Sequence, residues 1–131
     1  MDARAFIRIG MSAERLLAVT PEMTVRHFVP SMPAVYATPM MILAMETTSA
    51  DAIGAVLPEG FVTVGTEVDV RHLAATPVGR QVRTTARVTA VERKLIRFAV
   101  EAFDGDRRIG EGTHARGLVN VDSFAKRLEQ G

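Results

Sequence analysis

One long helical segment followed almost entirely by strands is the feature that most constrains the fold of this chain. The helix is predicted over residues 38–54, TPMMILAMETTSADAIG, where Thr38 suits the N-cap, Pro39 the first helical position and Gly54 the end. Much of its first two turns is apolar, and the stripe at helical spacing consists of Ile42, Met45, Ser49 and Ile53. A helix of this composition is usually enclosed by other elements rather than laid on a surface.

Four strands are predicted after this helix. Residues 62–73 alternate apolar and polar side chains up to His72, which places His72 on the face of the valines and Gly65 on the opposite face. The residues DGDR at 104–107 predict a hairpin turn, from which residues 108–121 return as a long strand. The apolar faces of the two intervening strands consist of Val82, Thr84, Ala86, Val88 and Ala90, and of Ile96, Phe98, Val100 and Ala102.

Two shorter elements complete the prediction. A short strand is expected around Thr24–Val29, before a proline-rich irregular segment that leads into the helix. The C-terminal VDSFAKRLEQ predicts a short closing helix capped by Asp122 or Ser123.

A single antiparallel sheet with one apolar face must cover that face, and the apolar helix is the element available to do so. The order of elements therefore predicts an α+β hotdog fold, a curved antiparallel sheet wrapped around one long central helix. The length of 131 residues suits one domain with a core of its own, so residues 1–131 are expected to form a single domain. Because one small chain leaves the sheet edges and the helix incompletely covered, we also expect a homodimer.

Charge and composition narrow the function classes. The formal net charge is +1 with no basic block, which argues against a nucleic-acid partner. There is no cysteine, so thiolate chemistry and sulfur-ligated metals are excluded. The N-terminus lacks the pattern of a signal peptide, and the longest apolar run, residues 39–45, is far shorter than the roughly 20 residues of a membrane span. We expect a cytoplasmic protein without a membrane partner.

Three residues carry chemistry that does not fit their predicted surroundings. Glu46 lies within the apolar helix, where an unpaired buried carboxylate would cost several kcal/mol, unless it marks an exposed helix edge or a satisfied polar contact. His72 ends an apolar strand face and is either a core histidine or a group that polarises a reacting atom. Thr38 is a helix cap in the simplest interpretation, and its hydroxyl also lies where the helix field favours negative charge.

The remaining motifs are weaker. His114 and Arg116 in EGTHARG share one strand face, which is either an exposed polar face or, at Arg116, a contact for an anion. The chain contains no zinc-protease motif, phosphate loop or dinucleotide fingerprint, and no calcium loop at its acidic turn.

The segments YATPMMILAME, VGTEVDVRHLAATPVG and IGEGTHARGLVNVDSF resemble the fluoroacetyl-CoA thioesterase family of hotdog proteins, over nearly the whole chain. The resemblance implies that Thr38, Glu46 and His72 are the catalytic threonine, glutamate and histidine. It further implies that Gly65 lies near the acyl group and that Arg116 takes part in substrate binding.

The resemblance is weakest in HFVPSMPAVYATP, before the helix. Where the fluoroacetyl-specific enzyme has aromatic lid residues, this chain has Val29 and Met32, so Met32 is implied to be a substrate-binding residue and the acyl group is left open. The implied reaction is hydrolysis of a short or medium acyl-CoA to the carboxylic acid and free CoA, with no metal or organic cofactor. Glu46 is then either a nucleophile or a general base, and the site belongs to one subunit or is shared by two.

Two other functions compete with this one. A hotdog hydratase or dehydratase would also use an acid and a histidine, and a non-catalytic protein could bind acyl-CoA or another small ligand. The set of Thr38, Glu46 and His72 favours the thioesterase, because binding alone does not require it.

Overall fold

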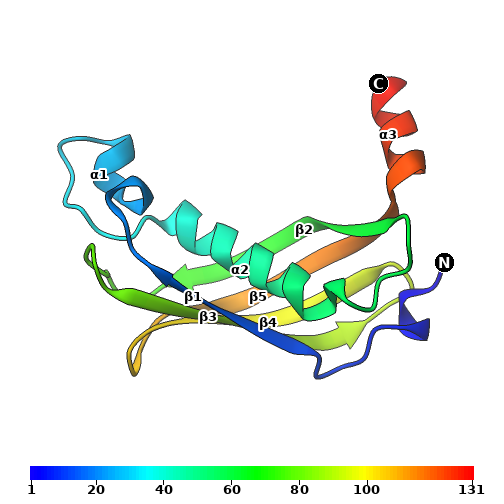
Figure 1. Ribbon diagram of the computed structural model, residues 1–131, viewed down its shortest axis with the longest axis horizontal. Coiled ribbons are helices and arrows are strands. Elements are labelled where there is room, and N and C mark those ends of the chain that lie inside the picture. Colours follow the sequence, from blue (N-terminus) through cyan, green and yellow to red (C-terminus); the bar gives the residue numbers. More distant parts are fainter.

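The computed structural model describes residues 1–131 and shows a five-stranded antiparallel sheet curled around one long helix (Figure 1). The helix, α2 (Thr38–Gly54), lies along the concave face of the sheet and packs chiefly against β3 and β1. This is the predicted hotdog architecture. The strands, in the order β1-β3-β4-β5-β2 across the sheet, are β1 (Ser12–Ala18), β3 (Gln81–Val91), β4 (Leu95–Asp104), β5 (Arg107–Asn120) and β2 (Phe61–His72).

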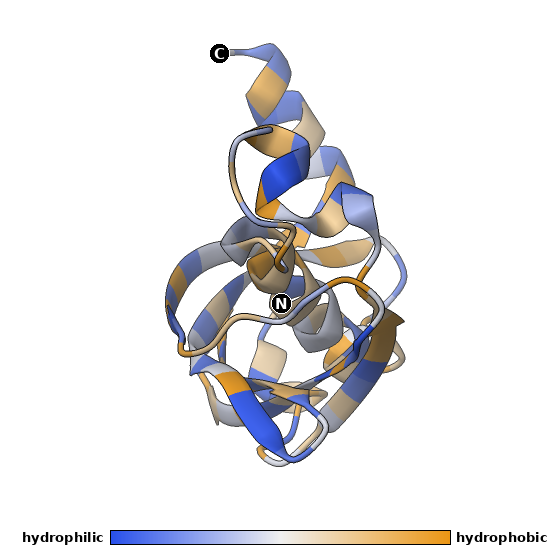
Figure 2. Cartoon of the chain, turned by 90° about the vertical axis from the view of Figure 1, so that its left-hand side faces the viewer, coloured by the Kyte–Doolittle hydropathy of each residue, from blue (hydrophilic) through white to orange (hydrophobic).

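The core lies between α2 and the central strands, as their alternation predicts. Apolar and polar residues alternate along the strands in Figure 2, and in β4, and in β3 as far as Val88, every second residue is buried. Each large apolar side chain that is fully buried contributes about 1.5–3 kcal/mol to stability. The principal core residues are Met41, Met45 and Ile53 of α2, Val82, Ala86 and Val88 of β3, and Ile96, Phe98, Val100 and Ala102 of β4.

The prediction of a strand around Thr24–Val29 is wrong. Residues Val25–Phe28 form the short helix α1, and the first strand of the sheet is β1, which the sequence did not reveal. The physical reason is the place of β1 at the edge of the sheet, where most of its side chains are exposed on both faces and the sequence SAERLLA need not alternate. Two 3-10 turns, Ala3–Ala5 and Pro21–Met23, complete the N-terminal part.

Both predicted helix caps are displaced along the chain. Ala37 is the N-cap of α2, and Thr38 is its first helical residue, so the Thr38 hydroxyl makes no cap hydrogen bond and is free for another partner. The closing helix α3 (Val121–Glu129) is capped by Asn120, whose side chain accepts a hydrogen bond from the Ser123 backbone N–H at 3.0 Å. Neither Asp122 nor Ser123 is the cap.

A β-bulge in β2 interrupts the alternation that the sequence predicts. Gly65 pairs with Arg116 of β5 and Glu67 pairs with Ala115, so Thr66 is the extra residue. Residues paired across two strands share a face, and the bulge therefore puts Gly65 on the same inner face as His72. The prediction that these two residues lie on opposite faces is wrong.

The inner face of β2 is only thinly covered by its own chain. Val68 is 41% exposed, and all five residues 65–69 are exposed, whereas the inner faces of β3 and β4 are buried. β2 is also an edge strand, so one side of its backbone has no partner strand. No helix of the chain is both long enough and apolar enough to cross a membrane.

Candidate active site

The first group of candidate residues lies where α2 begins and β2 ends. The Thr38 hydroxyl and the Nδ1 atom of His72 are 2.8 Å apart, which is hydrogen-bond distance. The Nε2 atom of His72 is buried and has no hydrogen-bonding partner. Burial lowers the pKa of His72, an effect that the backbone of Ala74 partly opposes, so the ring is neutral at pH 7. A neutral histidine with one nitrogen held and the other unpartnered is suited to accepting or donating a proton.

An apolar pocket of about 360 Å³ adjoins this pair. Five of its eight lining residues are aliphatic, and the others are Thr38, His72 and Tyr36, whose ring lies edge-on to His72 with the ring centroids 6.4 Å apart. Such a wall suits the hydrocarbon part of a ligand. The lining residues are Val25, Val35, Tyr36, Thr38, His72, Leu73, Ala74 and Ala75.

The second group surrounds Glu46, two turns further along α2. The Glu46 Oε2 atom lies 3.9 Å from the Nη1 atom of Arg116 on β5, and it occupies the space that a side chain at Gly65 would fill. A Cβ atom built on Gly65 would stand only 2.6 Å from that oxygen. Gly65 therefore makes room for the Glu46 carboxylate itself, and this close approach is what requires a glycine there.

Arg116 is buried and held by several partners. Its Nε atom donates to the Thr63 hydroxyl and its Nη2 atom to the Thr63 carbonyl, both at 2.9 Å, and Nη1 lies 3.2 Å from the Nε2 atom of His114. His114 is only 2% exposed and Arg116 only 8%, so the expectation of an exposed polar face in EGTHARG is wrong. The reason is that the inner face of the curved sheet encloses polar residues beside Glu46.

The two groups are separate within one chain. Thr38 and Glu46 are eight residues apart on α2, which corresponds to about 12 Å along the helix axis. The structure thus pairs Thr38 with His72, and Glu46 with Arg116 and Gly65, but it does not bring the three residues Thr38, Glu46 and His72 into contact.

Met32, the remaining predicted binding residue, lies apart from both groups. It follows α1 in the loop before α2, is 42% exposed, and its carbonyl accepts a hydrogen bond from Arg26 at 2.8 Å. Val29 in the same loop is 47% exposed. Neither residue lines the pocket beside His72.

Two residues of the site were not predicted, His114 and Tyr36. The sequence does carry a signal for His114, because it stands two residues from Arg116 on a strand and so shares its face. Tyr36 lies in an irregular segment, where no periodicity indicates which side chain turns inward.

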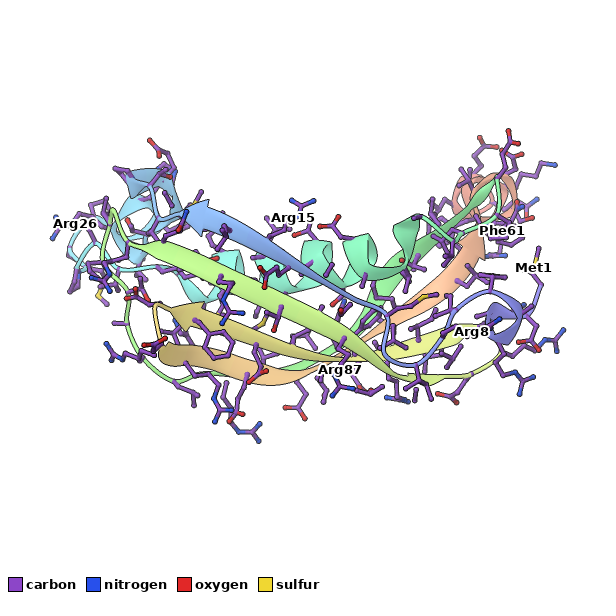
Figure 3. All side chains as sticks on the ribbon, turned by 60° about the horizontal axis from the view of Figure 1, so that its bottom comes forward. Met1, Arg8, Arg15, Arg26, Phe61 and Arg87 are labelled. Atoms are coloured by element: carbon purple, nitrogen blue, oxygen red, sulfur yellow. The ribbon has the colours of Figure 1, made fainter.

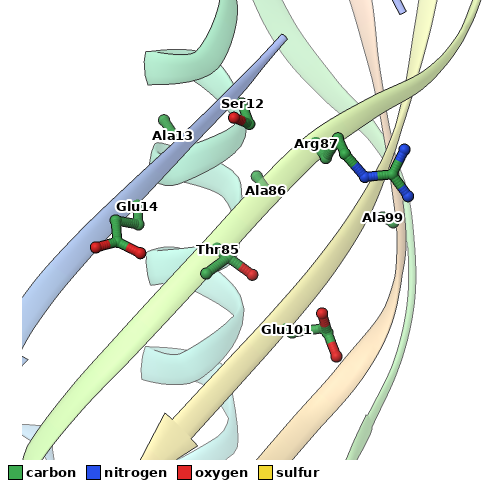
Figure 4. Close-up of a pocket in the computed structure, with 8 residues that line it drawn as sticks. All are labelled: Ser12, Ala13, Glu14, Thr85, Ala86, Arg87, Ala99 and Glu101. Atoms are coloured by element: carbon green, nitrogen blue, oxygen red, sulfur yellow. The ribbon is translucent and has the colours of Figure 1, made fainter. Parts of the chain in front are cut away.

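The largest depression of the surface lies away from these groups. It measures about 410 Å³ and is formed by β1, β3 and β4, with Glu14, Arg87 and Glu101 on its rim (Figure 4). Arg87 is one of many charged side chains on the convex side of the sheet (Figure 3). None of the residues that line this depression is a candidate site residue.

Comparison with known proteins connects these groups to one enzyme family. The family model for fluoroacetyl-CoA-specific thioesterases matches residues 19–122. The fluoroacetyl-CoA thioesterase of Streptantibioticus cattleyicolor is 35% identical over 130 residues, covering 95% of this chain and 94% of that protein.

Solved structures agree with the fold. A fluoroacetyl-CoA thioesterase structure superposes with a TM-score of 0.88 at 35% identity, covering 95% of this chain and 96% of the other. A thioesterase superfamily member from Thermus thermophilus gives 0.85 at 34% identity, covering 95% and 94%. A hot-dog-like protein from Thermanaerovibrio acidaminovorans gives 0.91 at 25% identity, covering 99% and 96%. These likenesses confirm the predicted hotdog fold.

Proposed function

The chain belongs to the fluoroacetyl-CoA-specific thioesterase family, and from this we infer that it hydrolyses an acyl-CoA thioester to the carboxylic acid and free CoA. The structural observation that carries the proposal is the 2.8 Å contact between Thr38 and His72 beside an apolar pocket. It supplies a fixed, neutral imidazole next to a wall that suits an acyl chain.

In the proposed reaction, Glu46 activates the attack on the thioester carbonyl. As a general base it takes a proton from water, whose oxygen bonds to the carbonyl carbon, and the C–S bond then breaks. As a nucleophile its oxygen bonds to that carbon instead, CoA leaves as the thiolate, and water cleaves the mixed anhydride. A hydroxamate formed by hydroxylamine on the Glu46 side chain itself would establish the second route, because a free carboxylate does not react with hydroxylamine.

The other residues of the site take supporting roles in this proposal. His72, as a neutral ring, donates a hydrogen bond from Nε2 to the departing sulfur, which then takes up the proton released by the attacking water, and Thr38 orients the ring through Nδ1. Arg116 places positive charge beside the Glu46 carboxylate, where the thioester oxygen gains negative charge. Carboxylate, imidazole, hydroxyl and guanidinium groups suffice for this chemistry, so we propose that the reaction uses no metal or organic cofactor.

We further propose that a homodimer builds the complete site. The exposed edge of β2 can pair with the same edge of a second copy about a two-fold axis, which makes the pairing antiparallel. With Thr66 bulged out, an axis at Asp69 puts Gly65 opposite the partner's His72 and Val68 opposite the partner's Val70. It also puts Glu67 opposite the partner's Arg71, which is a complementary pair.

This pairing explains why the two groups are separate within one chain. Gly65 marks the position of the Glu46 carboxylate, so the partner's His72 and Thr38 would meet Glu46 across the interface. It would also cover Val68 and the rest of the exposed inner face of β2. Each dimer would hold two sites, with Glu46 from one subunit and His72 from the other in each.

The acyl group is proposed to be short or medium and apolar, because most of the pocket wall beside His72 is aliphatic. The exposed lid residues Val29 and Met32 are not aromatic, and the fluoroacetyl group named for the relatives need not be the preferred one here. We place the reaction in the cytoplasm, where acyl-CoA metabolism supplies such substrates.

The test measures CoA release from a panel of acyl-CoAs that differ in chain length. Wild type should hydrolyse at least one of them, and Glu46→Gln and His72→Ala should each lose most of that rate. Glu59→Gln, at an exposed residue outside the site, is the matched control and should retain it. Binding of acyl-CoA without turnover across the panel would instead favour a binding protein.

A subunit-mixing experiment tests the shared site. Inactive Glu46→Gln and His72→Ala proteins are mixed and allowed to exchange subunits. If each site takes Glu46 and His72 from different subunits, half of the dimers are mixed and each has one intact site, so activity returns to about one quarter of wild type. No recovery, with mixed dimers shown by mass spectrometry, would place both residues in the same subunit.

A further inference from the structure

We propose that His114 is a positioning residue that holds Arg116 beside Glu46, acting only as the neutral ring with its proton on Nδ1. The inference rests on the proposed function for the role of Glu46, and it adds a residue that neither the family likeness nor the proposed chemistry assigns. His114 lines neither the pocket beside His72 nor the smaller pocket beside Glu46, which is formed by Leu43, Glu46, Thr47, Ala50 and Arg116.

The protonation state follows from the two partners of the ring. Nδ1 of His114 lies 2.7 Å from the backbone carbonyl of Glu67, and a carbonyl oxygen can only accept, so Nδ1 carries the proton. Nε2 lies 3.2 Å from Nη1 of Arg116, and a guanidinium can only donate, so Nε2 must present its lone pair. Only one form of the imidazole, neutral and protonated on Nδ1, satisfies both contacts.

The surroundings maintain that form. The ring is 2% exposed and stacks on Phe98, with centroids 6.2 Å apart and planes at 28°. Burial lowers the pKa of His114, the Glu67 carbonyl opposes this, Arg116 lowers the pKa further and Glu46 opposes it, with a net lowering. Arg116 and Glu46 are thus the charged groups that act on the ring, and a protonated ring would repel Arg116.

The contact with His114 controls the part of Arg116 that faces Glu46. Thr63 holds the Nε and Nη2 atoms of the guanidinium, whereas Nη1 is the atom next to Glu46 and has His114 as its only hydrogen-bond acceptor. Removing that acceptor leaves Nη1 with an unsatisfied donor in a buried place, and the guanidinium must turn to satisfy it. The distance from Arg116 to the Glu46 carboxylate would then change.

The bulge in β2 completes this arrangement. Because Thr66 is the extra residue, the backbone of Glu67 is turned so that its carbonyl reaches His114, and Gly65 is turned toward Glu46. The bulge at Thr66 therefore determines both the tautomer of His114 and the space that the Glu46 carboxylate occupies.

Two substitutions separate the two hydrogen bonds of the ring. His114→Gln brings an amide oxygen to about the place of Nε2 and keeps an acceptor for Arg116. His114→Asn reaches only to about the place of Nδ1 and keeps a donor for Glu67. We expect Gln to stay within about threefold of the wild-type kcat, and Asn to lose on the order of 10- to 100-fold, the effect of one lost hydrogen bond to a charged group.

A larger loss of kcat in His114→Gln than in His114→Asn would overturn the proposal, because the important contact of the ring would then be the one with the Glu67 carbonyl in the bulge. Equal losses in both variants, with unchanged thermal melting, would overturn it as well. The loss in Asn is expected in kcat, with KM changed by less than about threefold, since His114 does not line either pocket.

A measurement on wild-type protein tests the tautomer without relying on activity. The chain has three histidines, so ¹⁵N-histidine labelling gives three rings, which His27→Gln and His72→Gln variants assign. At pH 7, His114 should show a protonated Nδ1 and an unprotonated Nε2. A proton on Nε2 would overturn the proposal. If no acyl-CoA is hydrolysed, the proposed function fails, whereas this spectrum still decides the state of His114.

Discussion

Adding one methyl group at Gly65 is the sharpest perturbation that the structure offers. The Gly65→Ala side chain would stand 2.6 Å from the Glu46 Oε2 atom, where an ordinary contact needs at least 3.4 Å. The next atoms, at 3.3 Å in His114 and 3.6 Å in Arg116, are close to ordinary contact. The strain therefore falls almost entirely on the tip of the Glu46 side chain, which is flexible and 36% exposed.

The size of the effect follows from that displacement. The carboxylate oxygen must move by about 0.8 Å, the difference between 2.6 and 3.4 Å. Misplacing a reacting group by about 1 Å can cost on the order of 100-fold in rate, so we expect kcat to fall by roughly that factor. Stability should not fall, because Gly65 has no left-handed backbone angle and alanine within a strand is about 0.5–1 kcal/mol more favourable than glycine.

The assay combines CoA release with thermal unfolding. Gly65→Ala should lose most of its kcat while its melting temperature stays the same or rises. Gly54→Ala is the matched control, since a Cβ there meets nothing within 4 Å, and it should keep full activity. A Gly65→Ala enzyme with wild-type kcat would refute the role of the Glu46 carboxylate at this position. A marked fall in melting temperature would show instead that the strand, and not the carboxylate, absorbs the strain.

Three further predictions follow from the site and the proposed interface. Thr38→Val should lower kcat by about three- to tenfold, because it removes one hydrogen bond to His72, whereas Thr38→Ser should retain most of it in the same CoA-release assay. Glu67→Arg should weaken the dimer by about tenfold in Kd by sedimentation, and adding Arg71→Glu should restore it, unless the two side chains do not face one another in the dimer. Because His72 and His114 both have lowered pKa values, the unfolded state binds more protons below pH 6.5. The free energy of unfolding should therefore fall as pH drops below 6.5, and less steeply in His114→Gln than in wild type; equal slopes would contradict the buried neutral ring.

The sequence predicted those parts of the fold in which local pattern and burial coincide. The helix over residues 38–54, apart from its cap, and the inner faces of β3 and β4 are confirmed, since these elements are enclosed and their periodicity is enforced by the core. The first strand was misplaced, because β1 is an edge strand in which no side chain is fully buried, so its alternation is weak. Residues Val25–Phe28 were also misassigned, because valine and phenylalanine favour strands and a helix of four residues is too short to show a helical period.

The site was predicted as a set of residues but not as an arrangement. Thr38, Glu46 and His72 were each found from an anomaly in their surroundings. Their separation into two groups follows from the helix geometry, because eight residues span about 12 Å along the axis. That separation could have been worked out from the sequence alone, and in the proposed function it is bridged by a second subunit.

The bulge at Thr66 is the feature that the sequence could not reveal, and it has the largest effect on the site. VGTEVDVRH alternates without a visible break, since a bulge is fixed by pairing with β5 and not by the residues of β2 themselves. Without the extra residue, Gly65 would share a face with Glu67 and Asp69, on the outside of the sheet, and would meet neither Glu46 nor Arg116. The extra residue Thr66 also turns the Glu67 carbonyl toward His114, which holds Arg116. The space for the Glu46 carboxylate and the position of Arg116 therefore have the same structural origin. A chain of this fold that lacked the bulge could keep every one of the predicted residues and still have Gly65 and His114 in the wrong places.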